Sequence, residues 1–298
     1  MRELRLPQPS RGGTLSYLAL NGIILAEEEA RISPLDRGFL YGDGLFETLK
    51  AEPGRVHFLA RHLDRLARGC RTLGIPYPGD ADFRSLILEL LDRNGIRSQA
   101  AVKILVTRGT HRGHLTFEPC GPPTVAVFAR PYTPPNADRW AAGLSLSLER
   151  EVLENPSSGI CGLKTLNYLP FLLALDRAHR RGFDDALLLN GRGEICECAT
   201  SNLFFFRGGR LETPDEACGL LPGILRQAIL ECMAAAGEPV LEVQIGPEEL
   251  LQSDEIFVTN SLVEILPVGR IEGKIFAQRS QTRAVLERFT AWRDGRHD

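Results

Sequence analysis

A segment rich in proline, ARPYTPPNADR, interrupts the chain at residues 129–139. Proline lacks a backbone N–H and has a fixed φ, so it resists both a helix interior and a central strand. No single helix or central strand can therefore run through this stretch, and we interpret it as a linker between two lobes. The pattern predicts a disordered lead-in over residues 1–14, a small N-terminal α/β domain over 15–130, a linker over 131–136 and a larger C-terminal domain over 137–298.

The first part alternates between strand and helix patterns. Residues 15–25 predict a hairpin around the turn Asn21-Gly22. The following loop, ISPLDRGFLYGDG, leads into a second strand, and residues 62–73 carry the apolar spacing of an amphipathic helix. Asp80 or Asp82 can cap the next helix, which ends before Gly95. Two further strands, AVKILVT and TVAVFAR, close this part.

The second part shows the same mixture. A strand, LSLSLER, precedes a helix expected over about residues 168–181. Two strands around the turn NGRG, then LFFF and GRLETP, continue a sheet. A helix opened by Pro222 and Gly223, two more strands and a closing helix over 282–292 complete the chain. The expected fold class is therefore α/β or α+β, with strand-to-helix loops available for a site.

Composition argues against several classes of protein. The net charge of -3 offers no basic field for nucleic acid or an acidic membrane. No apolar run reaches the about 18 residues of a membrane helix, and the first residues lack the apolar core of a signal peptide. The seven cysteines have no CxxC spacing, which favours a reduced, cytoplasmic protein. Cys196 and Cys198 flank Glu197, but no further ligands stand at metal spacing, so we expect strand residues and no metal site.

Lysine is scarce, which shortens the search for an amine nucleophile: the chain holds Lys50, Lys103, Lys164 and Lys274. Lys274 is expected in solvent at a hairpin tip, Lys50 near the end of a strand, and Lys103 on either face of its strand. Lys164, in GLKTLNY, lies where a strand gives way to a helix. Partial desolvation there would lower its pKa and favour Schiff-base chemistry, whereas a plain surface lysine is the alternative.

Three other features have both a functional and an ordinary interpretation. The helix opened by Gly223 can bind a phosphate at its N-terminus or can simply be capped. Arg65 in RHLDRL can be a phosphate partner or a solvated helix residue. Glu197 lies in the apolar segment EICECA, so it needs a positive partner, either a protonated pyridine nitrogen or one of the many arginines.

The order of the motifs makes a family resemblance specific. From about Leu18 to Gly273 the sequence resembles the class IV aminotransferases, of pyridoxal-phosphate fold type IV, which include branched-chain and D-amino-acid aminotransferases and 4-amino-4-deoxychorismate lyase. The motifs that carry it are, in order, DRGFLYGDGLFET, HLDRL, VTRGTHRGH, GLKTLNYLP, ECATSNLF, LLPGILR and VTNSLVEILPV. The resemblance implies a two-domain enzyme with a small N-terminal lobe, a larger lobe that binds pyridoxal 5′-phosphate (PLP), and a homodimer with the site between the lobes and near the partner subunit.

The resemblance also implies roles for individual residues. Lys164 would hold the cofactor as a Schiff base and move the substrate proton. Glu197 would keep the pyridine nitrogen protonated, Tyr168 would contact the ring oxygen or its surroundings, and Leu221 would pack on a ring face. The phosphate would be bound by Arg65, the amides of Gly223, Ile224 and Leu225, and Ser261 and Leu262. Many relatives have threonine where this chain has Leu225, so one hydroxyl contact is missing. Tyr41 and Phe46 would line the substrate pocket, with Arg112 and His114 on a loop.

The motifs leave open which reaction of the family this chain catalyses. Arg112-Gly-His114 resembles the Arg-x-His loop of D-amino-acid aminotransferases and also a loop of aminodeoxychorismate lyases. TNSLVEILPV, ECATSNLF and Leu225 favour the lyase, which expels pyruvate from an amino-carboxylate substrate and leaves 4-aminobenzoate. A D-amino-acid or branched-chain aminotransferase is the alternative, with amine transaminases behind it. A non-catalytic binding protein of the same fold is remote, because Lys164, Glu197 and Arg65 are all retained.

Overall fold

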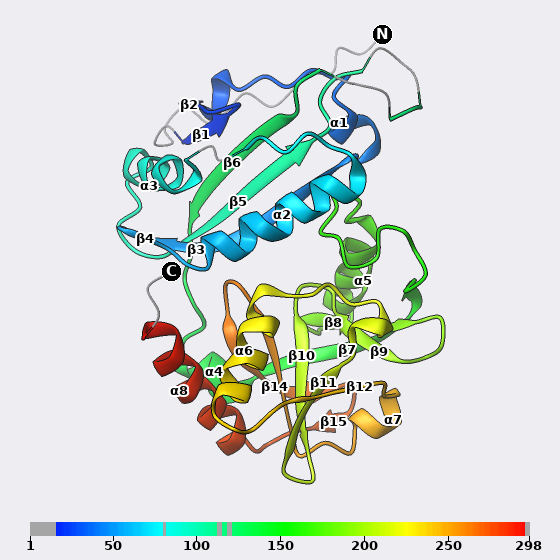
Figure 1. Cartoon of the computed structure of the whole chain (residues 1–298). Coiled ribbons are helices and arrows are strands. Elements are labelled where there is room, and N and C mark those ends of the chain that lie inside the picture. Colours follow the sequence, from blue (N-terminus) through cyan, green and yellow to red (C-terminus); the bar gives the residue numbers. More distant parts are fainter. Residues whose placement is uncertain (1–15, 80–81, 112–114, 118–120, 296–298) are drawn as a thin grey trace.

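The computed structural model describes residues 16–79, 82–111, 115–117 and 121–295 and forms two lobes, each built on one sheet (Figure 1). The first sheet uses strands between Tyr17 and Pro131, and the second uses strands between Leu144 and Ile275. The predicted linker leads from the end of the first sheet to a short helix, α4 (Ala137–Ala142). Within the described residues, no helix has the length and apolarity needed to span a membrane.

The first sheet is antiparallel, in the order β2-β1-β6-β5-β3-β4. Its strands are β1 (Tyr17–Leu20), β2 (Ile23–Ala26), β3 (Gly44–Glu52), β4 (Arg55–Val56), β5 (Ala100–Thr107) and β6 (Thr124–Pro131). The predicted hairpin at Asn21-Gly22 is confirmed, and both turn residues have positive φ, at 51° and 82°. The sheet therefore begins with the turn that the sequence indicates.

Two amphipathic helices cover this sheet, α2 (Leu59–Leu73) and α3 (Phe83–Arg93). Of the two predicted candidates for the cap of α3, Asp82 accepts a hydrogen bond from the Ser85 backbone N–H, and Asp80 lies outside the described residues. Helix α2 begins three residues before the predicted His62, because Leu59 extends its apolar face. The loop expected before β3 contains a short helix, α1 (Arg37–Tyr41), capped by Asp36.

The second sheet is mixed, in the order β12-β11-β10-β13-β14-β7-β8-β9, with β15 paired to β14. Its strands are β7 (Leu144–Glu154), β8 (Asp185–Asn190), β9 (Ile195–Cys198), β10 (Asn202–Arg207), β11 (Arg210–Pro214), β12 (Leu241–Val243), β13 (Glu255–Asn260), β14 (Glu264–Ile271) and β15 (Lys274–Ile275). Cys196 and Cys198 are buried strand residues, as expected. The parallel pair β7 and β8 is joined through α5 (Leu169–Arg180), so the segment before α5 emerges at one end of the sheet.

Helices α6 (Ile224–Ala235) and α8 (Ser280–Asp294) pack against phenylalanines of β10 and β13 in one apolar core. The remaining short helix, α7 (Pro247–Leu250), precedes β13. The predicted helices around residues 168–181, 221–237 and 282–292 are confirmed as α5, α6 and α8. The N-termini of α5 and α6 both face the gap between the lobes (Figure 1), where the cavity described below lies.

Candidate active site

A cavity of about 340 Å³ lies where the two lobes meet. The first lobe supplies β3, α2 and β5 to its wall, and the second supplies the segment before α5, the turn after β9, the N-terminus of α6 and the turn after β13. Predicted site residues in the wall are Phe46, Arg65, Lys164, Tyr168, Glu197, Leu221, Gly223, Ile224, Leu225, Ser261 and Leu262. Most of the predicted site is thus brought to one cavity.

Lys164 is held in the cavity by backbone pairing with β3. Its carbonyl accepts a hydrogen bond from the Phe46 N–H at 2.9 Å, and Leu166 N–H donates to the Gly44 carbonyl at 2.9 Å. Its Nζ lies 4.5 Å from the centroid of the Phe46 ring and 5.7 Å from that of Tyr168. Burial, together with the charge of Arg65, lowers the pKa of Lys164 to about 8, which raises the share of neutral amine at physiological pH.

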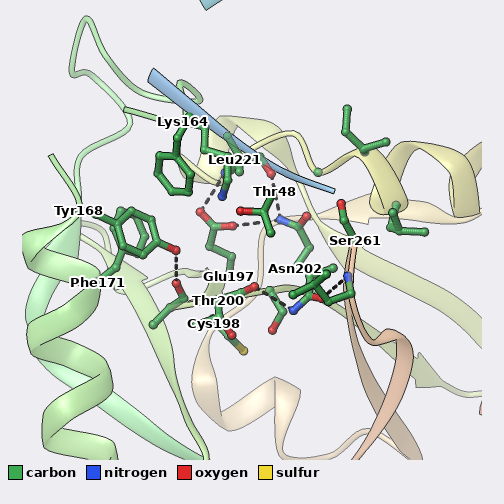
Figure 2. Close-up of a pocket in the computed structure, with 18 of the residues that line it drawn as sticks. Thr48, Lys164, Tyr168, Phe171, Glu197, Cys198, Thr200, Asn202, Leu221 and Ser261 are labelled. Carbon is green, nitrogen blue, oxygen red and sulfur yellow. Dashed lines mark hydrogen bonds between the residues drawn. The ribbon is translucent and has the colours of Figure 1, made fainter. Parts of the chain in front are cut away.

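Glu197 is buried at the floor of the cavity and is held by two donors (Figure 2). The Leu221 N–H donates to Oε1 at 2.9 Å, and Asn202 Nδ2 donates to Oε2 at 3.1 Å. Within the described part of the chain no arginine forms an ion pair with Glu197. The alternative that the sequence left open, a carboxylate paired with an arginine, is therefore not observed. Burial raises its pKa to about 8, against the opposing bond from Leu221. Such a carboxyl is suited to share a proton with a basic nitrogen.

Another part of the wall gathers groups that suit an anion. Gly223 is the N-cap of α6, so the amides of Ile224 and Leu225 in its first turn have no partner within the helix. Arg65 reaches this region, since its Nη1 donates to the Pro222 carbonyl at 2.9 Å. The Leu262 N–H, by contrast, is already bonded to Asn260 Oδ1 at 2.9 Å. The helix terminus and Arg65 together form a positive region.

Arg65 is oriented by Glu47, a buried carboxylate of β3. Nε and Nη2 of Arg65 donate to its two oxygens at 2.7 and 2.6 Å. Burial opposes the charge on Glu47, but the charge and hydrogen bonds of Arg65 outweigh it and lower the Glu47 pKa to about 2. With three N–H groups used by Glu47 and Pro222, an arginine keeps two of its five for a ligand.

Aromatic and apolar side chains line the space between these polar groups. Tyr168 stacks on Phe171 with ring centroids 4.7 Å apart and meets the edge of Phe46 at 5.3 Å. Its hydroxyl donates to the Ala199 carbonyl at 2.8 Å, and burial raises its pKa. Leu221 lies near Lys164 and Glu197 (Figure 2). A flat aromatic ligand fits a slot of this kind.

The residues expected at the substrate have different positions. Phe46 is buried and lines the cavity. Tyr41 lies on α1, outside the cavity and 47% exposed, because that helix directs it to the surface of this chain. Arg112 and His114 lie outside the described residues.

The structure adds residues that sequence reasoning missed or left open. Lys103 points into the cavity, with Nζ 4.5 Å from the Phe46 centroid. The alternation in AVKILVT assigns Lys103 to one face of its strand, but the sequence does not tell which face meets the cavity. Asn202 holds Glu197, and Glu47 holds Arg65. Each is a polar residue in an apolar segment, SNLFFF and LFETL respectively, and this was the sequence signal that could have identified it.

These groups fit PLP by their chemistry. A lysine amine of lowered pKa suits its aldehyde, a buried carboxyl with raised pKa suits its pyridine nitrogen, and a helix N-terminus with an arginine suits its phosphate. The slot between Tyr168 and Leu221 suits the ring. No part of the described wall places an unpaired carboxylate in the anion-binding region, since Glu47 is neutralised by Arg65.

The sequence of this chain is similar to those of known PLP-dependent enzymes. The family profile described as Amino-transferase class IV matches residues 44–271. The chain is 33% identical over 278 residues to a putative branched-chain-amino-acid aminotransferase of Methanocaldococcus jannaschii, covering 91% of this chain and 94% of that one. It is 31% identical over 269 residues to an aminodeoxychorismate lyase of Bacillus subtilis, covering 88% of each.

Solved structures agree with the sequence relatives. The branched-chain aminotransferase of the archaeon Thermoproteus uzoniensis, solved with norvaline, has a TM-score of 0.84 and 26% identity, covering 96% of this chain and 97% of that chain. A branched-chain aminotransferase from T.th., with a TM-score of 0.84 and 25% identity over 95% of this chain and 96% of its own, was solved with pyridoxamine 5′-phosphate. The chain belongs to the class IV aminotransferase family, with the α/β fold of fold type IV, and is a PLP-dependent transaminase or lyase.

Proposed function

We propose that this enzyme is a 4-amino-4-deoxychorismate lyase, which releases pyruvate from an amino-carboxylate and leaves 4-aminobenzoate. The observation that carries the proposal is Lys103, a second lysine in the wall of the cavity. Within the described residues no carboxylate lies within ion-pair distance of its Nζ, and burial lowers its pKa. A cation in such a place is suited to a negatively charged substrate. The proposed substrate has two carboxylates besides its amine, so it can engage both Lys103 and a further cation.

We assign the cofactor contacts by chemistry. Lys164 would hold PLP through its amine, and the bound cofactor would supply an electron sink for the carbon that loses a proton. Glu197, fixed by Leu221 and Asn202, would hold a proton at the pyridine nitrogen. Arg65, the amides of Gly223, Ile224 and Leu225, and Ser261 would bind the phosphate, whereas the predicted contact from Leu262 is not supported, because its N–H already donates to Asn260. Tyr168 and Leu221 would enclose the ring.

Lys164 would then act on the substrate as a base. Its pKa of about 8 lets it accept and return a proton near physiological pH. Phe46, Tyr168 and Phe171 would exclude water from the reacting carbon, which keeps the proton with the lysine. These steps are common to elimination and to transamination, so the substrate pocket decides between them.

An aminotransferase is the second candidate, and the apolar wall favours it. Phe46, Leu163, Phe171 and Leu172 offer space for an apolar side chain, as a branched-chain or D-amino acid would need. The first relative named above carries a branched-chain aminotransferase description. Under this reading Lys103 would meet the side-chain carboxylate of an acidic amino donor.

We further propose that two copies form a homodimer in the cytoplasm. Large apolar side chains are exposed on α1 and α5, among them Phe39 at 75% and Leu169 at 74%. Helix α5 lies beside the gap between the lobes (Figure 1), and the C-cap of α1, Gly42, accepts a hydrogen bond from Asn167, just before α5. A partner on this face would cover Tyr41 as well. Size-exclusion chromatography with light scattering tests this association.

Spectroscopy and product analysis test the reaction. An aminotransferase given an L- or D-amino acid alone converts its cofactor to the pyridoxamine form, and a 2-oxo acid restores it. The lyase proposal expects no such conversion, together with formation of 4-aminobenzoate and pyruvate from aminodeoxychorismate in equal amounts. Conversion by an amino acid, without product from aminodeoxychorismate, would replace the lyase by the aminotransferase. No cofactor absorbance and no product in either assay would contradict both.

A further inference from the structure

His62 is a fully buried histidine that does not line the cavity but contacts a residue that does. Its Nδ1 lies 2.7 Å from Glu47 Oε2, and its Nε2 lies 3.2 Å from the hydroxyl oxygen of Ser261. Its exposed fraction is 0%. Glu47, His62 and Ser261 thus form a chain of hydrogen bonds that runs from behind Arg65 to the wall of the cavity.

The protons in this chain can be assigned. Glu47 is ionised, because its pKa is held at about 2, so its oxygens can only accept hydrogen bonds. His62 Nδ1 must therefore carry a proton and donate it to Glu47. Burial lowers the His62 pKa, although Glu47 opposes that change, so the ring is neutral at neutral pH and Nε2 is an acceptor.

The assignment fixes the direction of the Ser261 hydroxyl. Its proton must point to His62 Nε2, because an unprotonated ring nitrogen needs a donor. Only oxygen lone pairs of Ser261 then face the cavity. A phosphoryl dianion needs donors, so it meets Ser261 in an unfavourable orientation.

We propose that His62 is a positioning residue that takes up one proton when the cofactor phosphate binds against Ser261. The proton comes from solvent and binds Nε2. His62 then donates to the Ser261 oxygen, and the Ser261 hydroxyl turns to donate to a phosphate oxygen. No covalent bond changes. The inference rests on the proposed phosphate contacts, and it adds to them a proton-linked step that sets how tightly the cofactor is held.

The charges that surround His62 decide the balance. Glu47 on β3 favours the protonated ring, whereas Arg65 on α2 and Lys164, before α5, oppose it. A bound phosphate adds negative charge beside Ser261. This change favours the imidazolium. Phosphate binding therefore raises the His62 pKa, and linkage makes anion affinity greater at lower pH.

Nitrogen NMR of histidine tests the proposal without a variant. In enzyme labelled with ¹⁵N in its histidine rings, we expect His62 of the apoenzyme at neutral pH to show the neutral Nδ1–H form. In the holoenzyme at the same pH, both ring nitrogens should be protonated. A neutral ring in a holoenzyme that absorbs as a Lys164-bound cofactor would overturn this inference alone. A protein that takes up no PLP would overturn the proposed function and this inference together.

Sulfate provides the second measurement, since it is a dianion with no proton to exchange near neutral pH. His62 has one pKa in the free apoenzyme and a higher pKa with sulfate bound. Between these two pKa values, the affinity of the apoenzyme for sulfate should fall by about tenfold per pH unit as pH rises. His62→Asn keeps a donor for Glu47 but cannot be protonated, so this slope should disappear. His57→Asn is the control, because His57 is also buried and bonded to a glutamate, Glu52, at 3.0 Å, but Nε2 of His57 contacts no described residue of the cavity wall, whereas Nε2 of His62 contacts Ser261. It should keep the slope; equal slopes in the wild type and His62→Asn would refute the proton uptake.

Discussion

Lys103 and Lys164 lie against the same aromatic ring, each with its Nζ 4.5 Å from the centroid of Phe46. They come from different lobes, Lys103 from β5 of the first sheet and Lys164 from the segment before α5. Each has a pKa lowered by burial, and Lys103 contributes to the low pKa of Lys164. One cavity thus holds two amines that differ in their neighbours: Arg65, Glu47 and Glu197 influence the charge of Lys164, whereas burial alone lowers the pKa of Lys103.

Replacing Lys103 by methionine should weaken the binding of substrates with a second carboxylate. The change keeps the length and the apolar contact with Phe46 but removes the charge. We expect KM for aminodeoxychorismate to rise by about 10- to 100-fold, the value of a hydrogen bond between charged groups. KM for an apolar amino acid should change less than twofold if such a substrate is accepted. The same rise for both substrates would contradict a role for Lys103 in charge recognition.

Gly223→Ala should damage cofactor binding through Asn202. A Cβ at Gly223 would overlap Asn202 Oδ1, and Asn202 also holds Glu197 and the Leu221 carbonyl. The φ of Gly223 is -66°, which alanine adopts freely, so the effect is steric. We expect the Kd for PLP to rise by at least about tenfold, equal to 1.4 kcal/mol, measured by absorbance titration of apoenzyme.

Gly246→Ala is a matched control for that change. Gly246 is likewise an N-cap, of α7, with φ at -88°, and a Cβ there would meet nothing within 4 Å. It should bind PLP as the wild type does. If Gly223→Ala also bound PLP normally, Asn202 would not be the support of Glu197 that its contacts indicate.

Glu264→Gln should destabilise the fold, because Glu264 joins the lobes. Its carboxylate pairs with Lys50 of the first sheet and with Arg293 of α8, and Lys50 is only 7% exposed. Removing the charge leaves the buried Lys50 without a counterion beside Arg293, which keeps its pair with Asp294, at a cost of about 3–5 kcal/mol. Glu89→Gln breaks an exposed pair with Arg93 and should cost less than about 1 kcal/mol. Urea unfolding of the apo forms measures both, and equal losses would disprove the special role of Glu264.

Lys164→Met should stabilise the apoenzyme below pH 8. The Lys164 pKa is about 8 in the folded chain against an ordinary 10.5, so folding is penalised while the lysine is charged. That penalty is complete below pH 8, amounts to at most about 3 kcal/mol, and declines as pH rises from 8 to 10.5. The gain from methionine should follow this course in urea unfolding. Lys274→Met, at an exposed lysine, should give no gain, and a Lys164→Met gain independent of pH would contradict the desolvation argument.

Much of the fold follows from local patterns in the sequence. Asn21-Gly22 marks a hairpin, Asp82 a helix start and Gly223 another, and the structure confirms each. These predictions succeed because the turn or cap depends on a few neighbouring residues. Helix α1 was missed because five residues carry too little periodicity to distinguish a helix from a loop.

The site was harder to predict where it depends on contacts distant in sequence. Lys164 could be selected from four lysines by its segment and the family resemblance. Lys103 could not, because the face of a strand that meets the cavity is set by the packing of the second lobe. The link from Glu47 through His62 to Ser261 joins β3, α2 and the turn after β13, and no spacing within one segment indicates it.

Borohydride trapping tests the central claim most directly. Sodium borohydride should bleach the holoenzyme and leave a phosphopyridoxyl group that peptide mass spectrometry locates on Lys164, with none on Lys103. Lys164→Met should yield no labelled peptide, whereas Lys103→Met should be labelled as fully as the wild type. A label on Lys103, or a holoenzyme in which no lysine is labelled, would contradict the account.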